Sequence, residues 1–145
     1  MPESSGPHEA LDQITADARA LQQSLHHTPI DCARVLTDRV TEAQALAAGA
    51  LHLFLGLERE ASHDPSARLL RLDRVARTAK AAQDASAELT AALARVVENQ
   101  RRRADAPTSP PVLIRPTPQQ FIASAADLLD GLLALCHALR RDHSR

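Results

Sequence analysis

Small and large apolar side chains recur at intervals of three and four residues along two long segments of this sequence, 29–61 and 65–104. That spacing is typical of the buried face of an α-helix. The first series is Ala33, Leu36, Val40, Ala43, Ala47, Ala50, Phe54 and Leu57. The second series is Leu72, Val75, Ala79, Ala82, Ser86, Leu89, Leu93 and Val96. Folded antiparallel about residues 62–64, the two series set small against small at the centre and large against large toward the ends, which predicts one closely packed hairpin.

Three polar residues that directly precede a proline mark predicted helix starts: Thr28, Asp64 and Thr117. The side-chain oxygen of such a residue accepts from free N–H groups of the first turn, and proline lacks an N–H that would go unpaired there. Asp31 and Gln120 stand three residues after the first and third caps, as in a capping box. The predicted helices are therefore 8–27, 29–61, 65–104 and 118–141.

These segments predict an all-α fold, an antiparallel bundle of about four helices built on the long hairpin. Residues 1–145 are expected to form one domain, with 1–7 as a disordered tail and 105–117 as a proline-rich linker before the last helix. Within the linker, the apolar triplet Val112, Leu113 and Ile114 is expected to lie against the bundle. The apolar face of segment 118–141 is wide, so this helix should contact more than one neighbour or share its surface with a second copy.

The net charge of −1 hides an uneven distribution. Residues 1–64 contain ten acidic and four basic side chains, whereas residues 65–103 contain nine basic and four acidic ones. Either the two parts neutralise each other, with Asp38, Glu42, Glu58 or Glu60 as partners, or the basic part binds another molecule. The candidate partner surface is Arg68, Arg71, Arg74, Arg77 and Lys80, although steps of three wind these cations around a helix.

Few residues of the sequence suggest a catalytic or metal-binding site. Glu60 and His63 have the Glu-x-x-His spacing of di-iron bundles, but the second copy that such a site requires is missing. His52 stands alone in an apolar run, and Cys136 with its neighbour His137 sits on a wide apolar face. Glycine-rich phosphate loops, zinc spacings and serine elbows are absent from the sequence. We therefore predict no catalytic, cofactor-binding or metal-binding residues and no cofactor.

The sequence predicts a cytoplasmic protein. Two cysteines are too few for a disulfide scaffold, and the first residues lack the features of a secretory signal. The apolar run 45–57 is shorter than the ~20 residues that cross a bilayer, so no membrane role is expected. The first hypothesis is a non-enzymatic helical scaffold or protein-interaction module that binds a protein partner or itself. The alternative is a nucleic-acid accessory or regulatory protein that uses the basic N-terminal half of segment 65–104, and a third hypothesis is a small-ligand or metal-using bundle.

Overall fold

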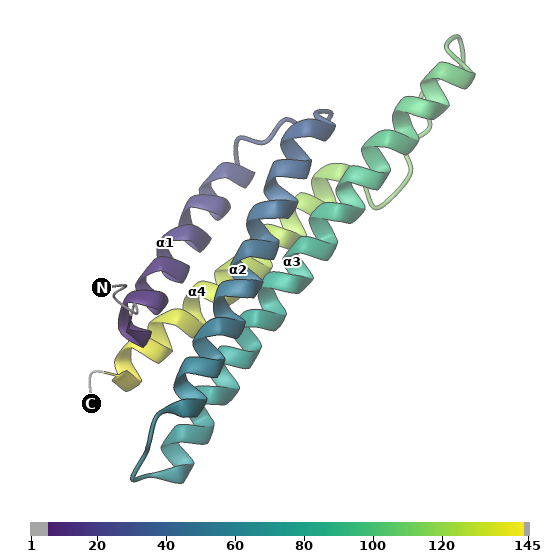
Figure 1. The fold of residues 1–145 in the computed structure, drawn as a ribbon. Helices are drawn as coiled ribbons and strands as arrows, with labels where there is room; N and C mark the ends of the chain where they lie inside the picture. The colour runs from purple at the N-terminus through teal and green to yellow at the C-terminus, as the bar shows by residue number, and fades with distance from the viewer. Residues whose placement is uncertain (1–5, 144–145) are drawn as a thin grey trace.

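The computed structural model describes residues 6–143, and all regular structure within this range is helical, as predicted. Four helices follow one another: α1 (Pro7–Leu25), α2 (Ala33–Arg59), α3 (Pro65–Asp105) and α4 (Pro118–His143). The predicted tail at residues 1–5 lies outside the described residues, and Pro7 already belongs to α1. The chain is a helical bundle (Figure 1).

The helices form two layers. α2 and α3 make the most extensive contact, α1 packs on α2, α4 packs on α3, and α1 and α4 contact each other. Short turns at residues 26–32 and 60–64 reverse the chain, so α1, α2 and α3 run alternately up and down. One face of the α2–α3 layer is therefore covered by α1 and α4 (Figure 1).

The direction of α4 follows from its contacts with α3. Arg74 forms an ion pair with Asp142, and the Arg95 guanidinium lies over the Phe121 ring, 5.6 Å from its centroid. Along α3 the contacts are separated by 21 residues, from Arg74 to Arg95, and along α4 they are separated by 21 residues in the opposite direction, from Asp142 back to Phe121. α4 therefore runs antiparallel to α3.

The contacts between α1 and α4 give the same result. Asp12 pairs with Arg140, and the Gln22 side chain donates to Asp130. The second contact lies ten residues after the first along α1 and ten residues before it along α4. α1 and α4 are thus also antiparallel, and all neighbouring helices of the bundle alternate in direction. The expectation that α4 contacts more than one neighbour is confirmed.

The small residues predicted at the centre of the hairpin are buried. Ala43, Ala47, Ala50, Ala79 and Ala82 are each at most 4% exposed. Larger seam residues toward the ends, including Phe54 and Leu57, are buried on one side and pack against the core. The one-to-one pairing of the two series stays a prediction, but the burial of both series agrees with a close approach of α2 and α3.

Two of the three predicted helix starts are confirmed. The Asp64 carboxylate accepts from the backbone N–H groups of Ser66 and Ala67 at 3.0 and 3.2 Å. At the start of α4, the Gln120 N–H donates to the Thr117 hydroxyl at 3.2 Å, and the Thr117 N–H donates to the Gln120 side chain at 2.8 Å. This reciprocal pair is a complete capping box.

The predicted start of a helix at Thr28-Pro29 is wrong. The Thr28 hydroxyl donates to the Ser24 carbonyl at 2.9 Å, so it pairs with a carbonyl at the C-terminal end of α1 and does not cap the N-terminal end of α2. α2 begins at Ala33, with Cys32 as an N-cap that makes no side-chain hydrogen bond. Asp31 consequently has no part in a capping box.

α3 is the longest helix, with 41 residues, and reaches beyond its neighbours (Figure 1). Its last turns and residues 106–117 form a projecting end, where the chain turns and comes back along the helix. The expectation that Val112, Leu113 and Ile114 lie against the bundle is largely wrong. Val112 and Leu113 are 72% and 66% exposed, and Ile114 is half-buried.

Candidate interaction surfaces

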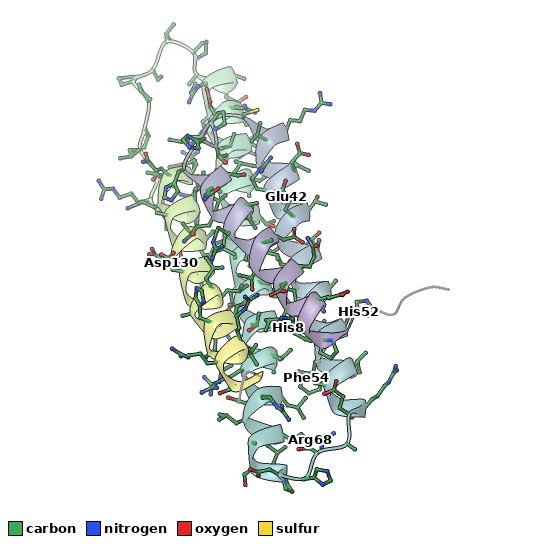
Figure 2. The ribbon with its side chains drawn as sticks, turned by 90° about the vertical axis from the view of Figure 1, so that its left-hand side faces the viewer. His8, Glu42, His52, Phe54, Arg68 and Asp130 are labelled. Atoms are coloured by element: carbon green, nitrogen blue, oxygen red, sulfur yellow. The ribbon has the colours of Figure 1, made fainter. Side chains whose placement is uncertain are left out.

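The basic N-terminal half of α3 is tied to the rest of the molecule. The Arg68 guanidinium donates to the backbone carbonyl of Glu58 and closes the α2–α3 turn, beside which it lies in Figure 2. Arg74 pairs with Asp142 on α4, and both side chains are about a quarter exposed. These two arginines therefore hold helices together.

The other cations of this stretch are also mostly neutralised. Arg77 and Lys80 pair with Asp73 and Asp84 one turn away on α3, at 2.9 and 2.6 Å. Arg71 is half-buried and has no ion-pair partner among residues 6–143. The candidate surface thus does not present five convergent free charges. Its acidic partners lie on α3 and α4, and not in the first 64 residues as the sequence suggested.

The motifs that suggested metal or nucleophile chemistry are not brought together. α2 ends at Arg59, so Glu60 and His63 stand in the turn and do not share a helical face. His52 is exposed on α2. Among the described residues, no group of three or more histidine, cysteine, aspartate or glutamate side chains could hold a metal ion.

Cys136 lies between α1 and α4, beside a cavity of about 190 Å³ that Thr15 and Arg19 also line. The thiol is 1% exposed. Burial raises its pKa above the ordinary value, and a hydrogen bond with Thr15 opposes this shift to a smaller degree. A raised pKa keeps the thiol protonated and disfavours nucleophilic chemistry. Cys32 is also free but lies beyond the far end of α1.

A groove with a volume of about 730 Å³ lies at the projecting end. One wall is the last two turns of α3, and the other is the returning linker, which arches away from the helix at the opposite end from Arg68 (Figure 2). We call this feature the α3–linker groove. Its lining residues are Asn99, Arg102, Arg103, Asp105, Ala106, Pro107, Ser109, Pro110, Pro111, Val112 and Leu113.

The α3–linker groove combines apolar and cationic groups. Val112 and Leu113 are the most exposed large apolar side chains among the described residues. Residues 99–117 contain four arginines and a single carboxylate, that of Asp105. Arg102 pairs with Glu98 at 3.2 Å, whereas Arg101 and Arg103 are exposed and have no partner within residues 6–143. Arg103 is therefore a free cation beside an uncovered apolar wall, whereas Arg101 is not one of the lining residues.

Arg95 fixes the linker where it returns to the bundle. Its guanidinium donates to the Ile114 carbonyl at 3.0 Å and to the Pro116 carbonyl, and it lies over Phe121. The Arg95 side chain is 17% exposed and also lies 3.5 Å from Glu98. Four prolines further restrict residues 105–117. The groove wall is therefore held in place without the linker packing on the core.

Sequence reasoning missed this groove because it treated the apolar triplet as an anchor, and because the Arg101–Arg103 run suits the negative end of a helix and so needs no further partner. The signal that could have found it is the juxtaposition of that run with a proline-rich segment too stiff to fold back fully. The other exposed large apolar side chains within residues 6–143 are Ile30, Leu51, Leu55, Leu69, Leu70 and Val97. None of them lies on α1 or α4, so the expected spare apolar surface of α4 is used within the bundle.

By length and composition alone, α2 and α4 are each apolar enough to cross a membrane, a property that core helices of soluble proteins share. Comparison of the chain with family models, curated proteins and solved structures finds no match. Function therefore has to be inferred from the surfaces themselves.

Proposed function

We propose that this chain is a non-enzymatic, cytoplasmic protein-interaction module, in which the bundle is a rigid scaffold and the α3–linker groove binds an acidic segment of a partner protein. The observation that carries the proposal is the open groove itself, with its apolar wall and the side chains of Arg102 and Arg103. Exposed apolar surface rimmed by polar groups is a feature of interaction sites.

The charges of the groove define the partner. Arg102 and Arg103 line the groove, and an arginine can bind a carboxylate through two parallel N–H donors, a geometry that lysine cannot provide. Val112 and Leu113 would be covered by an apolar side chain of the same partner. Covering one such side chain contributes about 1.5–3 kcal/mol before the costs of association. A segment that alternates acidic and bulky apolar residues fits both requirements.

The rigidity of the groove favours binding. The linker is already fixed by its prolines and by Arg95, so little conformational entropy remains to be lost when a partner binds. α3 continues as one helix from the turn near Arg68 to the groove, and its ion pairs connect it to α4. The arginines of the basic half of α3 are, in this proposal, structural parts of the scaffold.

Fluorescence anisotropy with a labelled peptide of alternating glutamate and leucine tests the proposal. We expect binding that weakens with salt, and that Arg102→Glu with Arg103→Glu abolishes. Leu113→Ser should weaken binding with little change in the salt dependence. Arg19→Glu with Arg34→Glu places the same charge change on α1 and α2, away from the groove, and serves as the matched control. Equal binding by the groove and control variants would contradict the proposal.

The nucleic-acid alternative is less well supported because four of the five cations in its candidate surface already have internal partners. It predicts DNA or RNA binding that falls steeply with salt and disappears when Arg71, Arg74 and Arg77 are neutralised. A labelled duplex in the same anisotropy assay distinguishes the two functions. Duplex binding that survives these substitutions would exclude the basic half of α3 as its site.

A further inference from the structure

A cleft of about 620 Å³ separates the C-terminal half of α1 from the N-terminal part of α2. We call it the α1–α2 cleft. It shares no residue with the α3–linker groove, so neither proposal depends on the other. Its lining residues are Ala20, Gln23, Ser24, His27 and Thr28 from α1 and the turn after it, and Val35 and Arg39 from α2.

The opening follows from the sizes of the side chains between α1 and α2. Where the two helices are close, at Gly49, an added Cβ atom would lie 3.5 Å from the Ile14 side chain. Nearer the end of α1, the helix presents the small side chains of Ala20 and Ser24 to the cleft. Isoleucine fills the space against α2 at the first point, and alanine and serine leave it open at the second. The cleft is therefore a consequence of the residues that line it.

The charge of the cleft lining is opposite to that of the surrounding chain. Residues 1–64 contain ten acidic and four basic side chains. The cleft lies within this acidic part, but its lining contains one arginine, Arg39, and no carboxylate. An anion in the cleft would therefore meet a cation and no like charge among the lining residues.

The other polar groups of the lining act mostly as donors. The Ser24 and Thr28 hydroxyls already donate to backbone carbonyls of α1, at 2.9 Å each. The Gln23 amide and the His27 ring are exposed at the rim, and each can donate a hydrogen bond. Together with Arg39, they suit a ligand that only accepts, and an ionised carboxylate is such a ligand.

One edge of the Arg39 guanidinium is unused. The side chain is 20% exposed, and its Nη1 donates at 3.0 Å to Glu42, which lies on α2 beside α1 (Figure 2). The Nε atom is buried, and no group within residues 6–143 accepts from it. Nε and Nη2 together form an edge through which arginine binds a carboxylate with two parallel N–H donors. Because a buried donor without an acceptor is unfavourable, this edge favours a ligand.

We propose that the α1–α2 cleft binds a small carboxylate anion, which pairs with the Nε and Nη2 edge of Arg39. The guanidinium turns toward the cleft when the anion binds, so that Nε gains an acceptor. Gln23 and His27 donate to the outer side of the carboxylate, and a short apolar part of the ligand lies against Ala20 and Val35. The cleft volume is within the range of about 300–1,000 Å³ that is usual for small-molecule sites.

The single cation of the cleft selects a monoanion. A phosphate ester carries close to two negative charges at neutral pH, so one arginine would leave it incompletely neutralised. A carboxylate carries one charge and matches the planar edge of the guanidinium. A free organic acid and the C-terminal carboxylate of a peptide share this chemistry, and the experiment below distinguishes them.

NMR titration of the ¹⁵N-labelled chain with isobutyrate tests the site. We expect saturable shifts of the Gln23 side-chain amide and the Arg39 Nε–H, with a Kd on the order of 1 mM for so small a ligand. Arg39→Gln should weaken binding at least about tenfold, as expected for the loss of a charged hydrogen-bond donor. Arg39→Lys keeps the charge without the planar edge, so its affinity should be intermediate.

Two control variants lie outside the lining residues. Arg34→Gln makes the same charge change at an exposed position of α2 and should bind as the wild type does. Glu42→Gln weakens the internal acceptor of Nη1, so it should bind isobutyrate at least as tightly as the wild type. The dispersion of the backbone amide signals shows in each case whether the variant is folded.

N-acetyl-alanyl-valine and its C-terminal amide identify the source of the carboxylate. Tighter binding of the free dipeptide than of isobutyrate would assign the cleft to a peptide end, and weaker binding would assign it to a free organic acid. The amide should not bind. Absence of saturable shifts, equal affinity of Arg39→Gln and wild type, binding of the amide, or tighter binding of inorganic phosphate than of isobutyrate would each overturn the proposal.

Discussion

Replacement of Arg95 by alanine should lower the free energy of unfolding by about 2 kcal/mol and release the linker. The guanidinium donates to the carbonyls of Ile114 and Pro116 and lies over the Phe121 ring. A hydrogen bond from a charged donor contributes about 1.5–3 kcal/mol and a cation–π contact about 0.5–1 kcal/mol. Water can solvate the freed carbonyls, so we count one hydrogen bond at its lower limit together with the ring contact. The ion pair with Glu98 adds little at the surface.

Urea denaturation followed by circular dichroism measures the global loss, and thermolysin digestion measures the release of residues 106–117. Arg95→Lys keeps a positive charge but replaces the planar guanidinium that lies over Phe121 with a compact ammonium, so its effects should be intermediate. Arg101→Ala removes an exposed arginine without a described partner and should change stability by less than about 0.5 kcal/mol. If Arg95→Ala matched Arg101→Ala in both stability and cleavage rate, the linker would have to be anchored in another way.

Four further predictions concern the bundle itself. Ala47→Leu or Ala82→Leu should overpack the centre of the hairpin and cost about 1–3 kcal/mol in urea denaturation, and an unchanged midpoint would contradict the close approach of α2 and α3. Thr117→Ala should cost about 1 kcal/mol by removing the α4 cap, whereas Thr117→Ser should retain most of that stability. In native protein, Ellman's reagent should modify Cys32 before Cys136, and equal rates would contradict the burial of Cys136. Burial raises the pKa of the Cys136 thiol. The stability that the neutral thiol contributes should therefore be fully present below the ordinary thiol pKa and lost as the pH rises through the raised pKa. Cys136→Ala should not show this loss.

Local signals in the sequence were sufficient for most of the architecture. The three-and-four spacing of apolar residues located the two long helices α2 and α3, and the caps at Asp64 and Thr117 marked the starts of α3 and α4. These signals succeed because they depend on groups within one or two helical turns of each other. Burial of the small residues around Ala47 and Ala82 likewise follows from a periodicity that is visible in each segment alone.

The failures arose where a residue had two possible partners. Thr28 can cap the helix after it or bond back to the helix before it, and only the path of the 26–32 turn decides between these. Val112 and Leu113 are apolar, but α3 extends so far past the other helices that no core lies beside them. The partners of Arg74 and Arg95 lie on α4 and the linker, at sequence separations that no local pattern encodes.

The alternation of all four helices also determines where this protein can be cut and joined. The described ends of the chain, at Gly6 and His143, lie near each other at the end of the α1–α4 layer that is remote from the linker (Figure 1). A short peptide could connect them, and new termini could be opened at the exposed residues around Ser109 without interrupting a helix. A circular permutant of this design would have α4 and α1 as consecutive helices, and because Ser109 lines the α3–linker groove, its binding would show whether the groove needs an uncut linker.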